Sequence, residues 1–161
     1  MTTPPFDPPT ADDIATVSAQ LGRPARNVIG ISARCVCGKP TVVSTRPRLE
    51  DGSPFPTLYY LSHPAATAAI STLEANGVMQ ELALEIDDRY TAAHEQYIAD
   101  REGIEFVEEI AGISAGGMPT RVKCLHALAG HALAAGSGVN PIGDRALELC
   151  GWSPNRCECA V

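Results

Sequence analysis

The sequence predicts an α+β fold, in which a small antiparallel sheet of about three strands packs against several helices. Two runs rich in β-branched residues, at 28–33 and 41–45, flank a short turn that contains glycine and proline, a pattern typical of an antiparallel hairpin. A third apolar run, at 57–61, follows a segment of turn-forming residues. A sheet of this size with one apolar face needs a cover, which the helix-forming remainder of the chain can supply.

Helices are expected where apolar residues recur at helical spacing and where capping residues mark the ends. Ile14, Val17 and Leu21, for example, lie at helical intervals and are followed by a glycine. Pro64 and Pro119 suit the first turn of a helix, where the backbone N–H that proline lacks has no partner within the helix. The expected helices span residues 12–21, 64–76, 78–86, 87–101, 119–135 and 141–150.

The composition predicts one globular domain. The chain has 161 residues, of which 45% are hydrophobic and 19% are charged, enough to bury a core without disulfides. Residues 1–10 contain four prolines and no apolar periodicity, so we expect a disordered N-terminal tail. Residues 11–150 are expected to form the single α+β domain, and residues 151–161 a flexible tail that contains cysteine.

Charge and hydropathy exclude several classes of protein. A formal net charge of −7 argues against general nucleic-acid binding, which needs a basic surface. No apolar run approaches the roughly 20 residues needed for a membrane span. The N-terminus lacks the features of a secretory signal, so a cytoplasmic location is expected. In that reducing compartment the six cysteines are expected as free thiols, metal ligands or redox groups.

The densest group of reactive side chains lies between residues 116 and 131, where a glycine loop precedes a predicted helix. The N-terminus of a helix attracts anions, because its first backbone N–H groups are unpaired and carry partial positive charge. We therefore predict an anion-binding site formed by Gly116, Gly117, Arg121 and Lys123. The alternative is that this loop is a flexible connector that only caps the helix.

Thiol and imidazole groups in the same segment predict a metal site of the zinc type. The helix cannot complete such a site alone. Cys124 and His126 would lie about 200° apart around it, and Cys124 and His131 roughly 10 Å apart along it. Cys35 beside the hairpin turn, and His63 between the third strand and the next helix, could supply the missing ligands. The predicted metal ligands are Cys35, His63, Cys124 and His126.

Several points stay open at this level. His131 competes with His126 for one ligand position, and iron accepts the same ligands as zinc. Cys35 and Cys124 could instead be buried small hydrophobic residues, as free cysteines often are. The remaining thiols have no assigned role, although the three nearest the C-terminus could form a second metal site or a redox pair. These thiols are Cys37, Cys150, Cys157 and Cys159.

A set of short strings, taken together, resembles the bacterial family catalogued as domain of unknown function 501. The strings are Leu21-Gly22-Arg23, Arg34-Cys35, Pro54-Phe55-Pro56-Thr57-Leu58-Tyr59-Tyr60-Leu61, Ala92, His94, Glu95, Tyr97, Ser114-Ala115-Gly116-Gly117-Met118-Pro119, Arg121-Val122-Lys123-Cys124-Leu125-His126, His131 and Gly138-Val139-Asn140-Pro141-Ile142-Gly143-Asp144. They extend over residues 21–149, and the resemblance implies a shared fold and motif set without a reaction.

The resemblance also bears on the metal site. It implies that relatives carry cysteine where this chain has His63, an exchange that a zinc site tolerates because both groups bind zinc. It implies that Cys37, Cys157 and Cys159 lie outside the family pattern. Relatives are often encoded beside a septum-formation protein and an exopolyphosphatase-like enzyme, which associates the family with cell-envelope or phosphate metabolism.

The leading interpretation is an uncharacterised cytoplasmic protein with a Cys/His metal site, of zinc type, next to an anion-binding loop. One alternative is a hydrolase or transferase that acts on a small phosphorylated or carboxylated substrate. Another is a metal-free interaction module for a cell-division or envelope protein. The sequence alone identifies no reaction, no partner and no oligomeric state.

Overall fold

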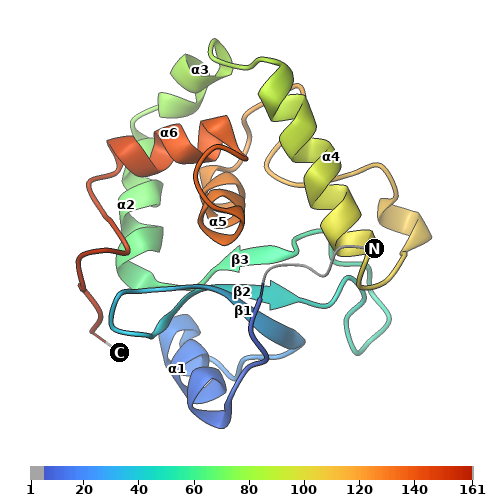
Figure 1. Cartoon of the computed structure of the whole chain (residues 1–161), viewed down its shortest axis with the longest axis vertical. Helices are drawn as coiled ribbons and strands as arrows, with labels where there is room; N and C mark the ends of the chain where they lie inside the picture. Colours follow the sequence, from blue (N-terminus) through green and yellow to red (C-terminus); the bar gives the residue numbers. More distant parts are fainter. Residues whose placement is uncertain (1–5, 161) are drawn as a thin grey trace.

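A three-stranded antiparallel sheet separates one helix from all the others (Figure 1). The computed structural model describes residues 6–160. The strands are β1 (Val28–Arg34), β2 (Pro40–Thr45) and β3 (Tyr59–Leu61), in the order β1-β2-β3. The predicted α+β class and the antiparallel hairpin are confirmed.

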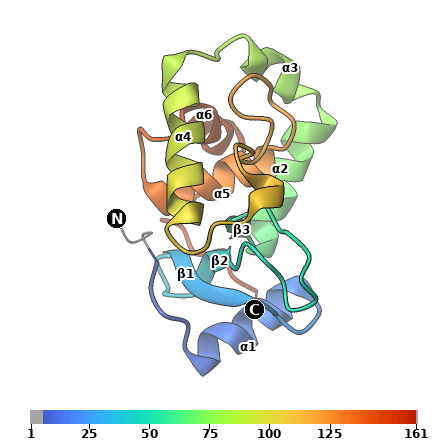
Figure 2. The same ribbon diagram turned by 90° about the vertical axis from the view of Figure 1, so that its right-hand side faces the viewer.

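Six α-helices and one 3-10 turn complete the described chain. Helix α1 covers one face of the sheet, whereas α5 lies on the other face, enclosed by α2, α4 and α6 (Figures 1 and 2). The helices are α1 (Ala11–Leu21), α2 (Pro64–Ala75), α3 (Val78–Ala83), α4 (Asp88–Glu102), α5 (Leu125–Ala135) and α6 (Pro141–Leu149), and η1 (Glu108–Ile110) is the 3-10 turn. Within residues 6–160, no helix has both the length and the apolar character needed to cross a membrane.

The central strand β2 is buried on both faces, since helices cover both sides of the sheet. Val43 packs with Val17 of α1 and Ile31 in a small cluster on one face. Val42 belongs to the large cluster on the opposite face, as side-chain alternation along a strand requires. The hydrophobic core is therefore divided by the sheet into two unequal parts.

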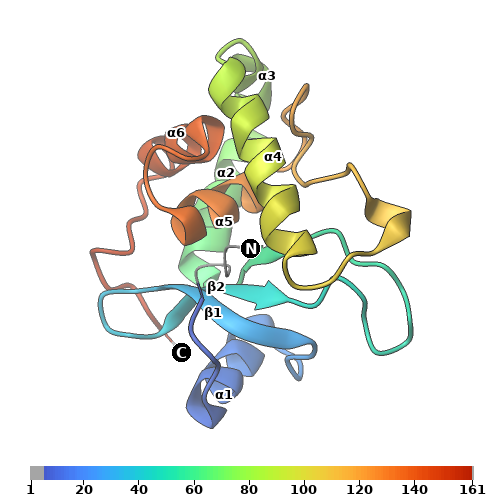
Figure 3. The same ribbon diagram turned by 45° about the vertical axis from the view of Figure 1, so that its right-hand side comes forward.

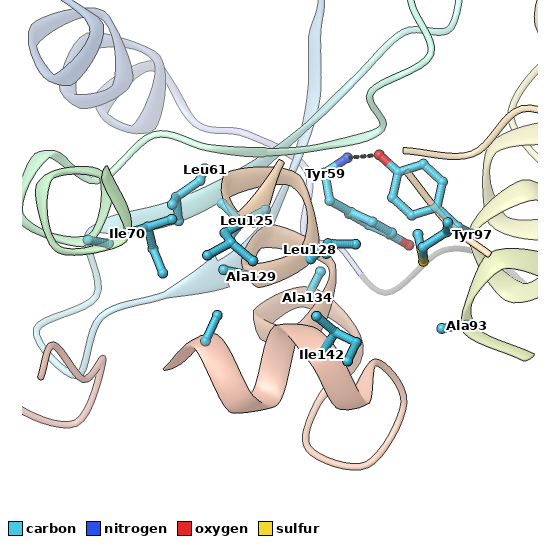
Figure 4. Packing of buried hydrophobic residues seen from close by; sticks show 14 of the residues in the cluster. Tyr59, Leu61, Ile70, Ala93, Tyr97, Leu125, Leu128, Ala129, Ala134 and Ile142 are labelled. Atoms are coloured by element: carbon cyan, nitrogen blue, oxygen red, sulfur yellow. Dashed lines mark hydrogen bonds between the residues drawn. The ribbon is translucent and has the colours of Figure 1, made fainter. Parts of the chain in front are cut away.

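Helix α5 is the centre of the large cluster, where Leu125, Leu128 and Ala129 are fully buried (Figure 4). A helix that is apolar nearly all round needs neighbours on every side. Gly130 allows the closest of these contacts, because a Cβ atom there would lie 2.8 Å from the carbonyl oxygen of Tyr59 in β3. The absence of a side chain thus lets α5 rest directly on the sheet.

The start of α5 differs from the prediction. The sequence predicts a helix from Pro119, but the helix begins at Leu125, so this boundary is wrong. The N–H of Lys123 donates to the carbonyl oxygen of Gly116 at 2.7 Å, and the N–H of Arg121 donates to that of Gly117 at 2.8 Å. These hydrogen bonds close the segment into a turn, which takes the backbone groups that a helix would need.

Described residues near both ends of the chain, Asp7 and Pro154, form hydrogen bonds with the hairpin. Asp7 pairs with Ile31 of β1 through two backbone hydrogen bonds of 2.8 Å, while residues 1–5 of the predicted tail lie outside the described residues. In the predicted C-terminal tail, Trp152 is only 4% exposed and belongs to the large cluster. The N–H of Val36 donates to the carbonyl oxygen of Pro154 at 2.9 Å, which places the C-terminal segment beside the hairpin turn (Figure 3).

An ion pair joins α1 to the end of β1. The guanidinium of Arg34 donates to both carboxylate oxygens of Asp13, at 2.8 and 3.0 Å. These hydrogen bonds lower the pKa of Asp13 to about 2. Asp13 also completes a capping box with Thr10 at the start of α1.

We expect Asp13→Asn to lower the free energy of unfolding at pH 7 by about 1 to 2 kcal/mol, because the amide keeps the cap but loses the charge. A carboxylate whose pKa is depressed in the folded state stabilises that state above its unfolded pKa. The difference from wild type should therefore disappear as the pH falls from about 4 towards 2. Urea unfolding at several pH values measures it. The exposed Asp12→Asn is the control, and an equal pH profile for both variants would contradict the assignment.

Candidate metal centre

Four thiols from opposite ends of the chain meet beside the turn between β1 and β2. All their Sγ atoms lie within 4.8 Å of one another. We call this group the four-cysteine cluster; its members are Cys35, Cys37, Cys157 and Cys159. Cys35 is buried, Cys159 is half-buried, and the other two are exposed. Such a group could bind a metal ion.

The hairpin turn presents the first two thiols. The N–H of Cys35 donates to the carbonyl oxygen of Lys39 at 2.8 Å, and that of Gly38 donates back to Cys35 at 2.8 Å. Gly38 adopts a φ of 95°, a left-handed conformation that glycine accepts without strain. The tight turn places Cys37 at its tip, so that both thiols face the C-terminal segment.

The separation of the sulfur atoms fits a metal site better than a disulfide. The Sγ atoms of Cys37 and Cys159 are 3.6 Å apart. A disulfide would require about 2.05 Å. Around a tetrahedral zinc ion, Zn–S bonds of about 2.3 Å place neighbouring sulfurs about 3.8 Å apart. The separation of this pair is close to that value, and the remaining Sγ atoms of the cluster lie within 4.8 Å of one another.

Electrostatics within the cluster favour a bound cation. The backbone N–H of Lys39 lowers the pKa of Cys37 to about 7. Burial, followed by the neighbouring thiols, raises the pKa of Cys159 well above its usual value. Several thiolates cannot share so small a space without a positive charge, because like charges repel strongly at this distance. A divalent metal supplies that charge and deprotonates the thiols that it binds.

His63 lies next to the four-cysteine cluster and contacts Cys159. Its ring is 1% exposed and packs 5.3 Å from the ring of Trp152. Its Nδ1 atom accepts the N–H of Ala66 at 3.4 Å and so caps α2, while Nε2 lies 3.1 Å from Sγ of Cys159. Burial lowers the pKa of His63 and favours the neutral ring. With Nδ1 accepting, the proton sits on Nε2 and is donated to the sulfur.

A second group gathers at the start of α5. The ligand atoms of Glu74, Cys124 and His126 lie within 4.8 Å of one another, and all three residues are half-buried. A hydrogen bond from His126 lowers the pKa of Cys124, and the same contact raises the pKa of His126. Each of these pKa shifts is in the direction of the charged form of its group, the thiolate of Cys124 and the imidazolium of His126.

The predicted ligands are divided between these two groups. Cys35 belongs to the four-cysteine cluster with His63 behind it, whereas Cys124 and His126 belong with Glu74. Among residues 6–160 the four predicted ligands do not form one group. The only sequence signal for the observed cluster is its pair of Cys-x-Cys strings, at 35–37 and 157–159.

His131 lies in the hydrophobic core, not in either group. Its ring is stacked on Tyr59 at 5.6 Å and meets Tyr97 edge-on at 5.0 Å. Burial lowers the pKa of His131 to about 4, so the ring is neutral. The Nδ1 atom lies 3.1 Å from the side-chain nitrogen of Asn140 and accepts its hydrogen. These contacts are those of a core residue that orders α5 and α6.

The predicted anion-binding loop has a structural role of its own. The carbonyl oxygens of Gly116 and Gly117 accept the turn hydrogen bonds, while Arg121 and Lys123 are exposed. The N–H of Leu125, at the start of α5, already donates to Oε2 of Glu74 at 2.8 Å. A carboxylate of the protein therefore faces this helix end, and anion binding by the loop remains a prediction.

A cavity of about 360 Å³ lies on the α1 side of the sheet, over Val43 and Tyr60. Its lining includes two basic residues, Arg23 and Arg26, and two acidic residues, at 50–51. These mixed charges define no single class of ligand.

Together the fold and the site define a small α+β domain with a candidate thiolate metal centre. A family model described as "Protein of unknown function (DUF501)" matches residues 31–148. The chain belongs to this family. The matched range includes Cys35 and Cys124 but ends before Cys157 and Cys159. No curated protein and no solved structure matches the chain.

Gly117→Ala is expected to destabilise the turn before α5 severely. Its φ is 96°, and a Cβ atom would lie 2.7 Å from the backbone oxygen of Arg121. The matched control is Gly112→Ala, where φ is 77° and no atom lies within 4 Å. The control should lose about 1 to 2 kcal/mol from backbone strain alone, and Gly117→Ala about 2 kcal/mol more from the clash. Equal losses in urea unfolding would contradict the close packing.

Proposed function

We propose that this DUF501 protein binds a zinc ion in the four-cysteine cluster and that the ion fastens the C-terminal segment to the β1–β2 hairpin. The observation that carries this proposal is the convergence of four Sγ atoms within 4.8 Å. Thiolates are soft ligands, and a set of four is typical of zinc or iron. Reduced thiols suit the cytoplasm, the compartment that the sequence predicts.

The proposed role of the ion is structural. Four protein ligands fill a tetrahedral coordination shell and leave no position for a substrate or water. Two ligands come from residues 35–37 and two from residues 157–159, so the ion would close a long loop between them; Cys37 and Cys159, for example, are 122 positions apart. Closing a long loop removes much of the conformational freedom of the unfolded chain. Metal binding in such a site is coupled directly to folding.

His63 contacts a ligand of the proposed site without being a ligand itself. Hydrogen bonds from outside the ligand shell orient metal ligands and adjust the charge on them. The Nε2–H of His63 can stabilise negative charge on the sulfur of Cys159, which lies 3.1 Å away. We therefore propose that His63 positions a ligand, in place of the direct ligation that the sequence predicts.

Cys37→Ser and Cys159→Ser are each expected to remove one metal ion per chain. Elemental analysis of the purified, untagged protein measures the loss. Cys150→Ser is the matched control, because this thiol donates to the carbonyl oxygens of Leu147 and Trp152 and belongs to neither group of candidate ligands. Equal metal content in the wild type and in both cluster variants would reject the proposal. A folded, metal-free wild type would favour the interaction module instead.

His63→Asn should weaken zinc binding by about 10- to 100-fold, as loss of such a supporting contact commonly does. Asparagine is also a good N-cap, so the start of α2 is preserved, but its shorter side chain cannot reach Cys159. Competition with a chromophoric chelator measures the affinity. His94→Asn is the control, since His94 contacts Ser114 and not the cluster. An unchanged affinity in His63→Asn would show that the histidine does not support the site.

A further inference from the structure

We infer that Glu74, Cys124 and His126 form a second zinc site, which has three protein ligands and one open position. Glu74 lies near the end of α2, Cys124 is the N-cap of α5, and His126 lies in the first turn of α5. Carboxylate, thiolate and imidazole are all zinc ligands, and their donor atoms lie within 4.8 Å of one another. This site is independent of the four-cysteine cluster, with which it shares no residue.

The backbone at the start of α5 makes this grouping possible. Two residues that are two positions apart in a helix point about 200° apart, which separates their side chains. Cys124, however, precedes the helix and has an extended backbone, with φ −142° and ψ 105°. Its thiol therefore does not follow the helical spacing and can lie beside the ring of His126.

The contacts around His126 are those of a histidine prepared to bind a metal through Nδ1. Its Nε2 atom lies 3.3 Å from the carbonyl oxygen of Thr67 and 3.0 Å from Oγ of Ser71. A carbonyl only accepts hydrogen bonds, so the proton sits on Nε2. Nδ1 lies 3.3 Å from Oε1 of Glu74. It carries a proton while His126 is an imidazolium, and it offers its lone pair to an ion once that proton leaves. Metal-bound histidines commonly donate their other N–H to a carbonyl in this way.

The carboxylate of Glu74 is held in place by the same kind of contact. Its Oε2 atom accepts the N–H of Leu125 at 2.8 Å, the first N–H group of α5. The positive end of a helix attracts an anionic group, so this contact holds the carboxylate at the start of α5. Oε1 remains directed towards His126, where it can bind an ion. Two of the three ligands are thus oriented by hydrogen bonds from outside the ligand shell.

The two proposed zinc sites differ in coordination, because the second site has one position without a protein ligand. Zinc held by three protein ligands takes a water molecule or an exogenous ligand as its fourth. All three residues are half-buried, so solvent can reach the ion. The alternative is a metal-free ion pair, in which a doubly protonated His126 donates to both Glu74 and Thr67. Metal binding and this ion pair compete for the Nδ1 lone pair.

Metal counts on the full-length protein test the inference. After equilibration with excess zinc and removal of free metal, elemental analysis should find two ions per chain in the wild type. Cys124→Ser and Cys37→Ser should each retain one ion, and the combined variant none. Equal zinc content in Cys124→Ser and wild type would overturn the second site. If only Cys37→Ser loses zinc, the second site is rejected and the proposed site in the four-cysteine cluster stands.

Two further measurements distinguish the loss of a metal ligand from misfolding of the variant. Glu74→Gln keeps an oxygen for the N–H of Leu125 but is a poor ligand, so the second ion should bind at least about tenfold more weakly. Serine is a favourable N-cap, so α5 should form normally in Cys124→Ser, as circular dichroism would verify. With cobalt in place of zinc, Cys124→Ser should lose one thiolate-to-metal absorption contribution, and the control Cys150→Ser none. Unchanged cobalt spectra in both variants would also overturn the inference.

Discussion

The close packing of α5 is the constraint on which the rest of the structure depends. Gly130 allows α5 to touch the backbone of β3, and Gly143 of α6 lies against the carbonyl oxygen of Leu128 on its other side. Any side chain at either position would push the layers apart, because a Cβ atom would collide with backbone and not with a flexible side chain. This packing also sets the start of α5 against the end of α2, where Cys124 meets Glu74.

The two candidate centres differ in what would balance the negative charge of their ligands. In the four-cysteine cluster, burial and then the neighbouring thiols raise the pKa of Cys159, whereas the backbone N–H of Lys39 lowers the pKa of Cys37. A bound cation would balance the negative charge of several thiolates held this close together. At the start of α5, a carboxylate and a thiol are placed beside an imidazole and a helix N-terminus, which already carry partial or full positive charge. The first arrangement favours a closed structural ion, and the second favours an exchangeable one.

Local sequence patterns predicted most elements, because hairpins and helix ends depend on nearby residues. Gly22 ends α1 and Pro64 begins α2, as the patterns indicated. The start of α5 was predicted wrongly, since the turn at Gly116 is held by hydrogen bonds to residues seven and eight positions later, which no periodicity reveals. Local patterns could not reveal which candidate ligands come together in space. Glu74 is 50 residues from Cys124 and carries no motif.

By itself, the sequence determined the fold class, the order of the elements and the thiol and imidazole groups among the candidate ligands, since these follow from local patterning and composition. Only the tertiary structure decided which ligands meet. It brought Cys35 and Cys159 together from distant parts of the sequence, placed Cys124 with Glu74, and enclosed His131 in the core. The physical reason is that ligation requires atoms within a few ångströms of one another. That proximity is set by how distant elements pack, which the spacing of residues along the chain does not encode.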